Sequence, residues 1–191
     1  MESLNNLVEI QNSLSILKQG KIFVYPTDTV WGLGCDATSE KAVNKIFRIK
    51  QRSESKSLII LVSSFEMLKK YVPEVPETVK NILKSVVKPT TIIYNNPVGL
   101  ANNVVANDKT VAIRIVQNDF CKSLIQEFGK PIVSTSVNIS NEPTPKSYSE
   151  ISNHILDSVD YIVNSQRERI NDKSSTILKV AKKGEVIVLR K

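Results

Sequence analysis

The chain has 191 residues, of which 41% are hydrophobic and 24% are charged. A chain of this length buries roughly 70% of its unfolded surface, so it supports a core without disulfides. The composition is that of an ordinary globular protein and argues against disorder, collagen-like repeats and coiled coils. No linker or low-complexity tract divides the sequence, and we expect a single domain over residues 1–191.

Simple counts disfavour membrane, secreted and metal-cluster proteins. The longest unbroken apolar run covers residues 58–62, whereas a membrane span needs about 20 residues. Residues 1–6 lack the pattern of a secretion signal, so we expect a soluble, cytoplasmic protein with no membrane partner. Cys35, Cys121 and His154 are too few for a disulfide framework or a structural zinc site, and no metal ligands are predicted.

Lys and Arg outnumber Asp and Glu by 26 to 19, which gives a net charge of +7. Residues 41–56 hold six basic residues against one acidic residue, and residues 167–191 hold eight against three, so each stretch is net +5. If the fold brings the two stretches together, they form one cationic surface for an anionic partner. If it does not, the excess charge only keeps the protein soluble.

The first part of the chain reads as helix, strand, helix. Apolar residues recur at helical spacing over residues 4–17, between a capping Ser3 and Gly20. A buried strand is predicted at residues 22–25 and a second helix from about residue 39 to residues 51–52. The basic residues of that helix gather in its last turn, where the helix dipole favours cations.

The middle of the chain continues the alternation. A strand at 58–62 precedes a short helix opened by a capping box, Ser63-x-x-Glu66, and a further helix is predicted from residue 76 to about 87. Strands at 91–94, 111–115 and 132–134 enclose a helix at 119–128 that Gly129 ends.

A second capping box, Ser147-x-x-Glu150, predicts one more helix near the end of the chain. The closing strands are predicted at 161–163, 176–180 and 186–189, the last two joined by a hairpin turn at 182–184. Interleaved helices and strands predict a mixed α/β layer structure in which at least part of the sheet is parallel.

Gly32 to Ala37 match the dinucleotide-binding pattern G-x-G-x-x-A, but in the wrong context. The real motif places its glycines directly between a strand and its helix, whereas here residues 26–29 intervene and the next helix starts near residue 39. We therefore interpret the two glycines as residues that permit a tight backbone.

Three polar segments are candidates for a binding site. Residues 27–29 place two hydroxyls and a carboxylate at the end of a strand, where open α/β sheets bind ligands, although an ordinary turn is an alternative. Residues 50–52 carry two cations that can converge on one anion only if the helix end is frayed or extended. Residues 134–141 are rich in small donors and acceptors that suit phosphate or ribose.

The ordered segments of the chain also resemble a known family, the YrdC-type threonylcarbamoyl-adenylate synthases, from about Leu14 to the C-terminus. These segments are YPTDTVWGLG, IKQR, SLIILV, TVAIRI, GKPIVSTSVNIS, SSTIL and VLR. The length is similar to that of the single-domain bacterial form. The resemblance implies a YrdC-like fold, with a twisted sheet of parallel and antiparallel strands flanked by helices and a cationic concave face.

The resemblance further implies a nucleotidyltransferase that converts L-threonine, bicarbonate and ATP into threonylcarbamoyl-AMP and pyrophosphate. That product feeds the modification of adenosine 37 in tRNA, so downstream threonylcarbamoyl-transfer proteins are implied partners. A carbamate formed from threonine attacks the α-phosphorus of ATP, and because both reactants are anions the protein has to align them and neutralise charge. Mg²⁺ on the departing pyrophosphate is the expected cofactor.

The resemblance assigns the site residue by residue. Its catalytic K-x-R and S-x-N pairs fall on Lys50, Arg52, Ser136 and Asn138. The residues that it places around ATP are Arg52, Lys56, Thr110, Ser136, Thr144 and Arg190. Those that it places around threonine or its carbamate are Thr29, Leu61, Arg114, Ser134 and Ser175. Arg114 is the candidate for the amino-acid carboxylate because a guanidinium binds both oxygens.

The sequence departs from the family pattern at three places. Trp31 replaces the usual Tyr or Phe, residues 87–91 lack a loop glycine and gain a lysine, and Asn141 stands where glycine is usual. Asparagine also adopts a left-handed backbone, so the change at Asn141 is tolerable.

Two other functions compete with this one. A double-stranded RNA or tRNA-binding module without its own chemistry suits the two basic stretches, but the sequence lacks RNP aromatics and a G-x-x-G loop. A hydrolase or carbamoyltransferase that acts on related phosphates would use the same cleft.

Overall fold

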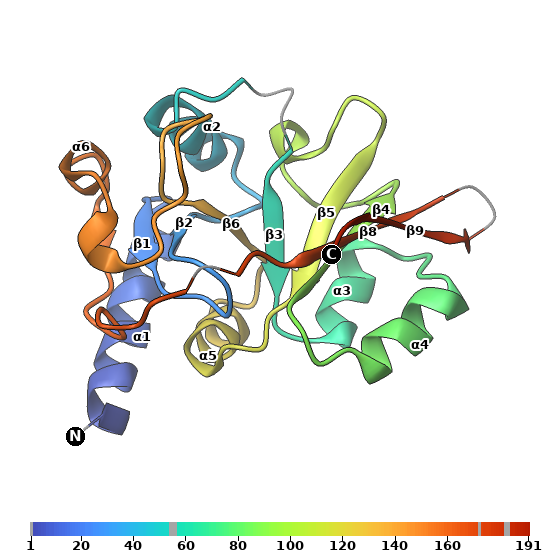
Figure 1. The fold of residues 1–191 in the computed structure, drawn as a ribbon, viewed down its shortest axis with the longest axis horizontal. Coiled ribbons are helices and arrows are strands. Elements are labelled where there is room, and N and C mark those ends of the chain that lie inside the picture. The colour runs from blue at the N-terminus through green and yellow to red at the C-terminus, as the bar shows by residue number, and fades with distance from the viewer. Residues whose placement is uncertain (1, 54–56, 172, 182–183) are drawn as a thin grey trace.

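The structure, a computed structural model, describes residues 2–53, 57–171, 173–181 and 184–191 (Figure 1). Its strands are β1 (Phe23–Tyr25), β2 (Gly32–Gly34), β3 (Ile59–Val62), β4 (Thr90–Asn95), β5 (Thr110–Ile115), β6 (Ile132–Ser136), β7 (Tyr161–Ile162), β8 (Thr176–Val180) and β9 (Val186–Arg190). Over the described residues they form one nine-stranded sheet in the order β7-β1-β2-β6-β3-β5-β4-β8-β9. The pairs β7–β1, β3–β5 and β4–β8 are parallel and the other neighbours are antiparallel, which confirms the predicted mixed α/β class.

The helices cover this sheet and one another. They are α1 (Glu2–Lys18), α2 (Glu40–Ile49), α3 (Phe65–Tyr71), α4 (Glu77–Ser85), α5 (Asp119–Phe128) and α6 (Asn153–Leu156), with 3-10 turns at Asn102–Val104 and Tyr148–Glu150. Helices α1 and α5 pack together, and α3 lies against β3 and β5 (Figure 1). Within the described ranges, no helix has the length and apolar character needed to cross a bilayer.

Local sequence signals explain several helix ends. Ser39 caps α2 by accepting a hydrogen bond from the Ala42 N–H, and Asn118 caps α5 by accepting one from Cys121. Helix α5 ends at Gly129, whose φ of 73° is the left-handed conformation that glycine adopts without strain. These ends lie where the sequence predicted them.

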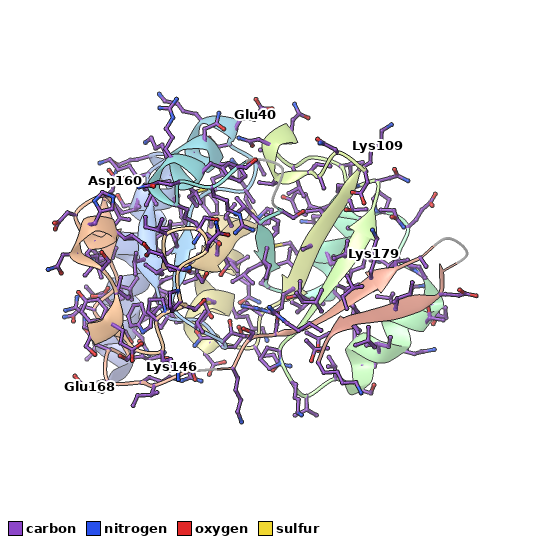
Figure 2. All side chains as sticks on the ribbon, turned by 45° about the horizontal axis from the view of Figure 1, so that its top comes forward. Glu40, Lys109, Lys146, Asp160, Glu168 and Lys179 are labelled. Carbon is purple, nitrogen blue, oxygen red and sulfur yellow. The ribbon has the colours of Figure 1, made fainter. Side chains whose placement is uncertain are left out.

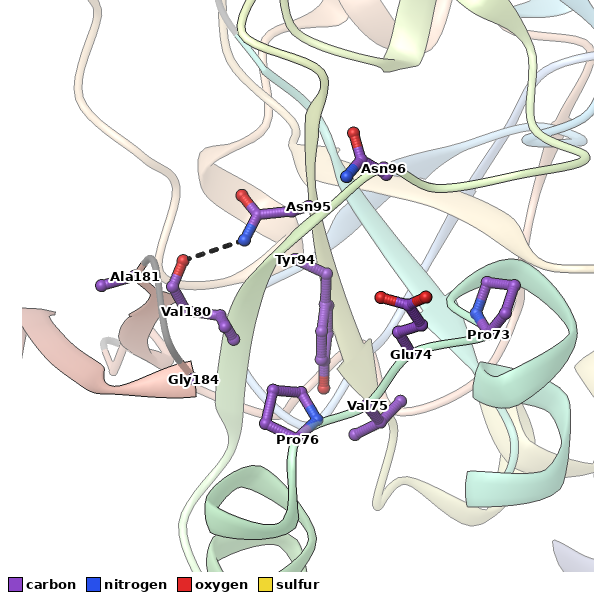
Figure 3. A pocket seen from close by; sticks show the side chains of 10 residues that line it. All are labelled: Pro73, Glu74, Val75, Pro76, Tyr94, Asn95, Asn96, Val180, Ala181 and Gly184. Carbon is purple, nitrogen blue, oxygen red and sulfur yellow. Dashed lines mark hydrogen bonds between the residues drawn. The ribbon is translucent and has the colours of Figure 1, made fainter.

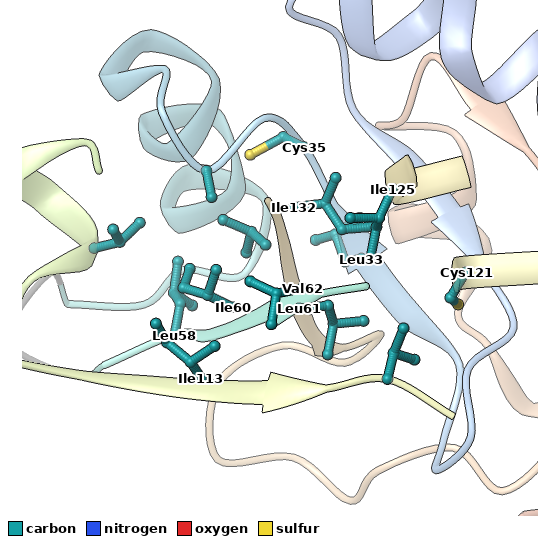
Figure 4. Packing of buried hydrophobic residues seen from close by; sticks show 14 of the residues in the cluster. Leu33, Cys35, Leu58, Ile60, Leu61, Val62, Ile113, Cys121, Ile125 and Ile132 are labelled. Carbon is teal, nitrogen blue, oxygen red and sulfur yellow. The ribbon is translucent and has the colours of Figure 1, made fainter. Parts of the chain in front are cut away.

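The core lies between the central strands and the helices α2 and α5. Ile60, Val62 and Ile132 are fully buried there, together with Leu33 of β2 (Figure 4). The two cysteines belong to this cluster: Cys35 and Cys121 are both buried free thiols. Both pack within this apolar cluster, and the Cys121 thiol also donates to the Pro26 carbonyl at 3.2 Å.

Strand β2 was not predicted, because Gly-Leu-Gly carries no strand signal of its own. It pairs antiparallel with β1 and β6, so Gly32 and Gly34 belong to a strand and not to a phosphate-binding turn. A Cβ on Gly34 would lie 2.5 Å from a ring carbon of Tyr25 and 2.9 Å from the Val133 carbonyl oxygen. Glycine is therefore required at residue 34 by close packing.

Both predicted capping boxes differ from the structure. The cap of α3 is Ser64, which accepts a hydrogen bond from Met67, while Ser63 is buried. Ser147 precedes only a 3-10 turn, and the Glu150 carboxylate accepts from the Lys146 N–H instead of the Ser147 N–H. The hairpin of β8 and β9 is confirmed by their antiparallel pairing, although residues 182–183 of its turn lie outside the described residues.

Candidate active site

One face of the sheet gathers side chains from six strands around a cavity of about 330 Å³. Side chains alternate along a strand, so residues opposite each other in register share a face. Ala112 lies opposite Ile59 and Ile93, and Arg114 lies opposite Leu61 and Thr91. The residues that line the cavity are Thr29, Val30, Trp31, Arg52, Ser57, Ile59, Thr91, Ile93, Ala112, Arg114, Ser134, Thr135, Ser136, Thr144, Ser174, Ser175, Ile177 and Arg190.

Most of the site residues assigned from the sequence meet in this cavity. Those in its wall are Thr29, Arg52, Arg114, Ser134, Ser136, Thr144, Ser175 and Arg190. They come from segments up to 161 residues apart, which only the sheet topology brings together. The assignments themselves remain predictions, since this placement shows proximity and not binding.

Four assigned residues lie outside the wall, and Lys56 lies outside the described residues. Leu61 shares a strand face with Ile59 but is fully buried below it. Thr110 lies on the same face as Ala112, two residues before it in β5. Lys50 and Asn138 contact the chain behind Ser136.

The surroundings of Thr110 explain why it lies outside the cavity. Its hydroxyl donates to Oδ1 of Asp108 at 2.6 Å, and Oδ2 of Asp108 pairs with Nζ of Lys179 at 3.2 Å. Lys179 belongs to β8, and Figure 2 labels it near the strands at the right of the view. A charged cluster therefore borders the cavity beyond Ala112.

Arg114 is the most deeply placed cation of the site, with 3% of its surface exposed. Its Nη2 lies 3.0 Å from Oδ1 of Asp28 and donates to the Thr29 hydroxyl at 3.3 Å. The Arg114 Nε is buried and has no hydrogen-bond partner in the described part of the chain. A buried donor without a partner is costly, so Arg114 is a point of the wall where the described protein groups leave a hydrogen bond unmade.

Hydroxyl groups surround Arg114 and are themselves held in place. The Thr27 hydroxyl donates to the Val30 carbonyl at 2.7 Å and lies 3.1 Å from that of Thr29. On the other side, the hydroxyls of Thr91 and Ser175 are 2.8 Å apart. Thr91 was not predicted as a site residue, since the sequence analysis placed it only in an altered loop and at the start of a strand. Its strand face and its pairing with β5 mark it as a wall residue.

Two further guanidinium groups complete a cationic wall. Arg52 donates from Nη2 to the Ser57 carbonyl at 2.9 Å, and burial lowers its pKa. Arg190 donates to the Ser175 carbonyl from both Nε and Nη2, at 3.0 and 2.9 Å. Burial and the nearby charge of Arg114 both lower the pKa of Arg190.

Among the described residues, each of the two basic stretches of the sequence contributes one cation to the same cavity. Arg52 comes from the first stretch and Arg190 from the second. None of the lining residues that the structure describes is acidic. A cavity of this size with three guanidiniums and several hydroxyls is suited to a highly charged anion.

Trp31 forms the aromatic part of the wall and was not assigned a role from the sequence. Its ring lies 5.3 Å from that of Tyr148, and the Arg167 guanidinium lies 4.4 Å from the Tyr148 ring. This aromatic and cation-π stack attaches the segment before α6 to the cavity rim.

A second hollow of about 530 Å³ is larger but chemically different. It lies between β4, β8 and the chain leading into α4, and its wall includes Tyr94, Glu74 and Pro76 (Figure 3). The described lining residues include a carboxylate and no Lys or Arg. Size alone therefore does not locate the anion site, and the smaller cavity fits it better.

Comparison with known proteins settles the family. The Sua5/YciO/YrdC family, described as "Telomere recombination", matches residues 15–191. The chain belongs to the Sua5/YciO/YrdC family. Its Sua5/YciO/YrdC relatives include the threonylcarbamoyl-AMP synthase of Pseudoalteromonas translucida, 33% identical over 85% of this chain and 92% of the relative. That of Escherichia coli K12 is 31% identical over 77% of this chain and 80% of the relative.

Solved structures of the Sua5/YciO/YrdC family agree with the fold. Pyrococcus abyssi Sua5 complexed with L-threonine matches with a TM-score of 0.86 at 28% identity, over 95% of this chain and 53% of that one. The chain thus spans about half the length of that Sua5. Escherichia coli YciO matches with a TM-score of 0.82 at 22% identity, over 100% of this chain and 89% of that one, and shows the fold alone.

These findings confirm the family and the fold predicted from the sequence. Relatives named threonylcarbamoyl-AMP synthase at 30–33% identity over most of the chain also confirm the predicted enzyme class and activity.

Proposed function

We propose that the chain forms threonylcarbamoyl-AMP and pyrophosphate from L-threonine, bicarbonate and ATP in the cavity lined by Arg52, Arg114 and Arg190. The observation that carries this proposal is the convergence of three guanidiniums and the hydroxyls on a wall without described acidic residues. Two anionic reactants, a carbamate and a triphosphate, repel each other, and such a wall offsets that repulsion.

The threonine end of the cavity is assigned to Arg114. Its free Nε and its depth suit a carboxylate that enters between the hydroxyls of Thr29, Ser134 and Ser175. Leu61 lies beneath this end as part of the core and would act through packing. The complex of Pyrococcus abyssi Sua5 with L-threonine supports a threonine site in this fold.

The ATP end is assigned to Arg52, Ser136, Thr144 and Arg190. Ser136 ends β6 at the rim of the cavity and Thr144 is exposed there, so both are accessible to a triphosphate. Thr110, beyond Ala112 on the same strand face, would meet a more distant part of the nucleotide.

The chain's own residues would accelerate the reaction by alignment and charge. A carbamate oxygen attacks the α-phosphorus, the bond from that phosphorus to the pyrophosphate oxygen breaks, and pyrophosphate leaves. Positively charged groups fixed in a protein stabilise the charge that develops in such a transition state without reorganising. Cys35 and Cys121, the strongest nucleophiles by type, are buried in the core, and burial raises the pKa of each thiol well above its usual value.

We propose that Mg²⁺ binds on the phosphates of ATP and not in a protein site. Mg²⁺ prefers carboxylate, phosphate and water oxygens. No group of three His, Cys, Asp or Glu side chains that suits a metal occurs in the described part of the chain. The protein residues therefore do not fit a resident metal site, and no step is derived through one.

We also propose that the product passes, in the cytoplasm, to proteins that transfer its threonylcarbamoyl group to tRNA. Basic surface residues would give at most weak contacts with RNA, because phosphate contacts by scattered lysines are salt-sensitive. The alternative, an RNA-binding module without its own chemistry, would leave the convergence of Arg52, Arg114 and Arg190 without a role.

The test combines protein, ATP labelled at the α-phosphate, L-threonine, bicarbonate and Mg²⁺. We expect pyrophosphate release that requires threonine and bicarbonate, together with a labelled adenylate that decays. Release without threonine would indicate a hydrolase, and no release with retained RNA binding would indicate the binding module.

A further inference from the structure

The K-x-R segment is the end of a helix and not a frayed tail. The Arg52 N–H donates to the Phe47 carbonyl at 2.9 Å and the Gln51 N–H donates to that of Arg48 at 3.1 Å. Gln51 has a left-handed φ of 48°. This pair of bonds around a left-handed residue is the Schellman motif, which turns the chain sharply after the helix. Lys50 and Arg52 therefore point to different places.

Arg52 lines the cavity, whereas Lys50 turns into the protein. The Lys50 side chain is 1% exposed, and its ammonium donates to the carbonyl oxygens of Ser136 and, at 2.6 Å, of Asn138. The Lys50 carbonyl in turn accepts from the Ser140 N–H at 2.8 Å. One residue thus makes three hydrogen bonds to the segment that follows β6.

Asn138 ties the same segment from within. Its Nδ2 donates to the carbonyl of Ile139 at 2.9 Å and to that of Glu142 at 2.8 Å. Between them, Lys50 and Asn138 bind four carbonyl oxygens of residues 136–142, which we name the β6 loop. Ser136 begins this loop and Thr144 follows it, and both line the cavity.

We propose that Lys50 and Asn138 are positioning residues, which fix the β6 loop so that Ser136 and Thr144 face the triphosphate, and that neither contacts ATP. Each of the family pairs K-x-R and S-x-N then contains one residue that faces the substrates and one that positions the loop. Arg52 and Ser136 face the substrates, while Lys50 and Asn138 hold the wall behind them. This inference rests on the proposed function for the identity of the ligand, but the arrangement of the loop is independent of it.

Charge and burial support this division. An ammonium removed from water requires partners, and two carbonyl oxygens supply them. The cost of that removal and the charge of Arg52 lower the pKa of Lys50 to about 8. A lysine that approaches phosphates directly would instead line the cavity, where Lys50 is not found.

Amide hydrogen exchange of the free protein tests the inference without any substrate. Lys50→Met keeps the volume of the side chain and removes its donors. We expect exchange in residues 137–142 to become roughly tenfold faster or more, because hydrogen bonds from a charged donor are worth about ten- to hundredfold. One control on the same helix, Lys45→Met, should leave exchange in the β6 loop unchanged, because the Lys45 ammonium donates to the Gly20 carbonyl instead.

Kinetics then separate positioning from general destabilisation. With Lys50→Met, the KM for ATP should rise roughly tenfold, while the KM for threonine stays within about threefold, because Arg114 and Thr29 lie outside the β6 loop. If Lys50 only stabilised the fold, Lys50→Met measured below its unfolding temperature would change the KM for ATP and the KM for threonine together, or change neither.

Asn138→Ala provides the second variant if Lys50→Met does not fold, since Asn138 is partly exposed and its loss is tolerable. It should show the same faster exchange and the same rise in the KM for ATP. Unchanged exchange with a lost ATP affinity would overturn the inference and make these residues direct ligands. Unchanged exchange with normal kinetics would also overturn it. Inactive wild-type protein with faster loop exchange in the variants would refute the proposed function alone.

Discussion

Asp28 and Arg114 form an ion pair at 3.0 Å in which the two side chains are only 8% and 3% exposed. Oδ2 of Asp28 also accepts from the Gln117 N–H at 3.1 Å, so the carboxylate is held at the ends of two segments. Oδ1 of Asp28 forms the ion pair with Arg114, but among the described residues it accepts no hydrogen bond. Asp28 thereby balances the charge of the Arg114 guanidinium, whose Nε has no partner among the described residues.

Asp28→Asn should destabilise the fold and weaken threonine binding together. Removing one partner of a buried pair leaves the other charge uncompensated, which costs about 3–5 kcal/mol. We expect a loss of that size in the free energy of unfolding, measured with denaturant, and a rise of at least roughly tenfold in the KM for threonine.

Asp108→Asn is the matched control, since Asp108 pairs with Lys179 at the surface and is solvent-exposed. It should change neither measurement detectably. Wild-type stability in Asp28→Asn would show that the pair contributes nothing to the fold.

Gln51→Gly should stabilise the protein by about 1 kcal/mol. Gln51 has a φ of 48°, and a residue with a Cβ pays roughly 1–2 kcal/mol for the left-handed conformation that glycine adopts freely. Gln51→Val should have the opposite effect, because a β-branched side chain tolerates this conformation least. Thermal unfolding of Gln51→Gly, wild type and Gln51→Val should give melting temperatures that decrease in that order. A lower melting temperature for Gln51→Gly than for Gln51→Val would contradict the prediction.

Arg190→Ala should weaken ATP binding by about ten- to hundredfold, the range of a charge-assisted hydrogen bond, and affect threonine less. Calorimetric titration measures both affinities. Arg190→Lys keeps the charge but cannot reproduce the paired contacts of Nε and Nη2 with the Ser175 carbonyl, so partial recovery is expected. Deleting Lys191 should have almost no effect. Equal ATP affinity in Arg190→Ala and wild type would reduce β9 to a structural edge strand.

Alkaline pH should destabilise the protein. Burial raises the pKa of Cys35, Cys121 and Tyr25 well above their usual values, so the folded state keeps protons that the unfolded chain loses from about pH 9 upward. The free energy of unfolding therefore falls as pH rises above about 9. Lys50 acts in the opposite direction between pH 8 and 10.5, because its lowered pKa makes the folded state lose its proton first.

Denaturant unfolding at pH 7 to 10 measures this slope. The double variant Cys35→Ala with Cys121→Ala should show a flatter decline, even though the loss of two buried side chains lowers its stability at pH 7. The same slope in the double variant and in wild type would mean that the thiols do not cause the decline.

Much of the fold follows from local signals, and the failures have physical causes. The start of α2 near Ser39, the end of α5 at Gly129 and the β8–β9 pairing were predicted, because each depends on neighbours in the sequence. Strand β2 was missed because it exists through its partners β1 and β6, with Gly34 where Tyr25 and Val133 leave no room for a side chain. Pairing of this kind is not encoded in a three-residue segment.

Site residues could be predicted where the family resemblance supplied them. Residues that join the site through contacts between distant segments could not. Arg52 and Arg114 could be assigned from their motifs. The pairing of Asp28 with Arg114, 86 residues apart, and of Thr91 with Ser175, 84 apart, has no signature in either segment alone. The inward turn of Lys50 was hidden for a related reason, since it depends on the left-handed Gln51, a residue type that does not mark helix ends.

The cavity wall begins at Thr29 and ends at Arg190, so it exists only after strands from both ends of the chain have joined the sheet. Contacts this distant in sequence form late in folding, because closing a long loop costs conformational entropy before the contacts that it brings together stabilise the chain. A partly folded chain therefore presents no complete binding surface. Substrates should therefore slow unfolding and leave the folding rate unchanged, because they bind only the complete site. The decrease in the unfolding rate on adding substrate then measures the formation of the site in the last step of folding.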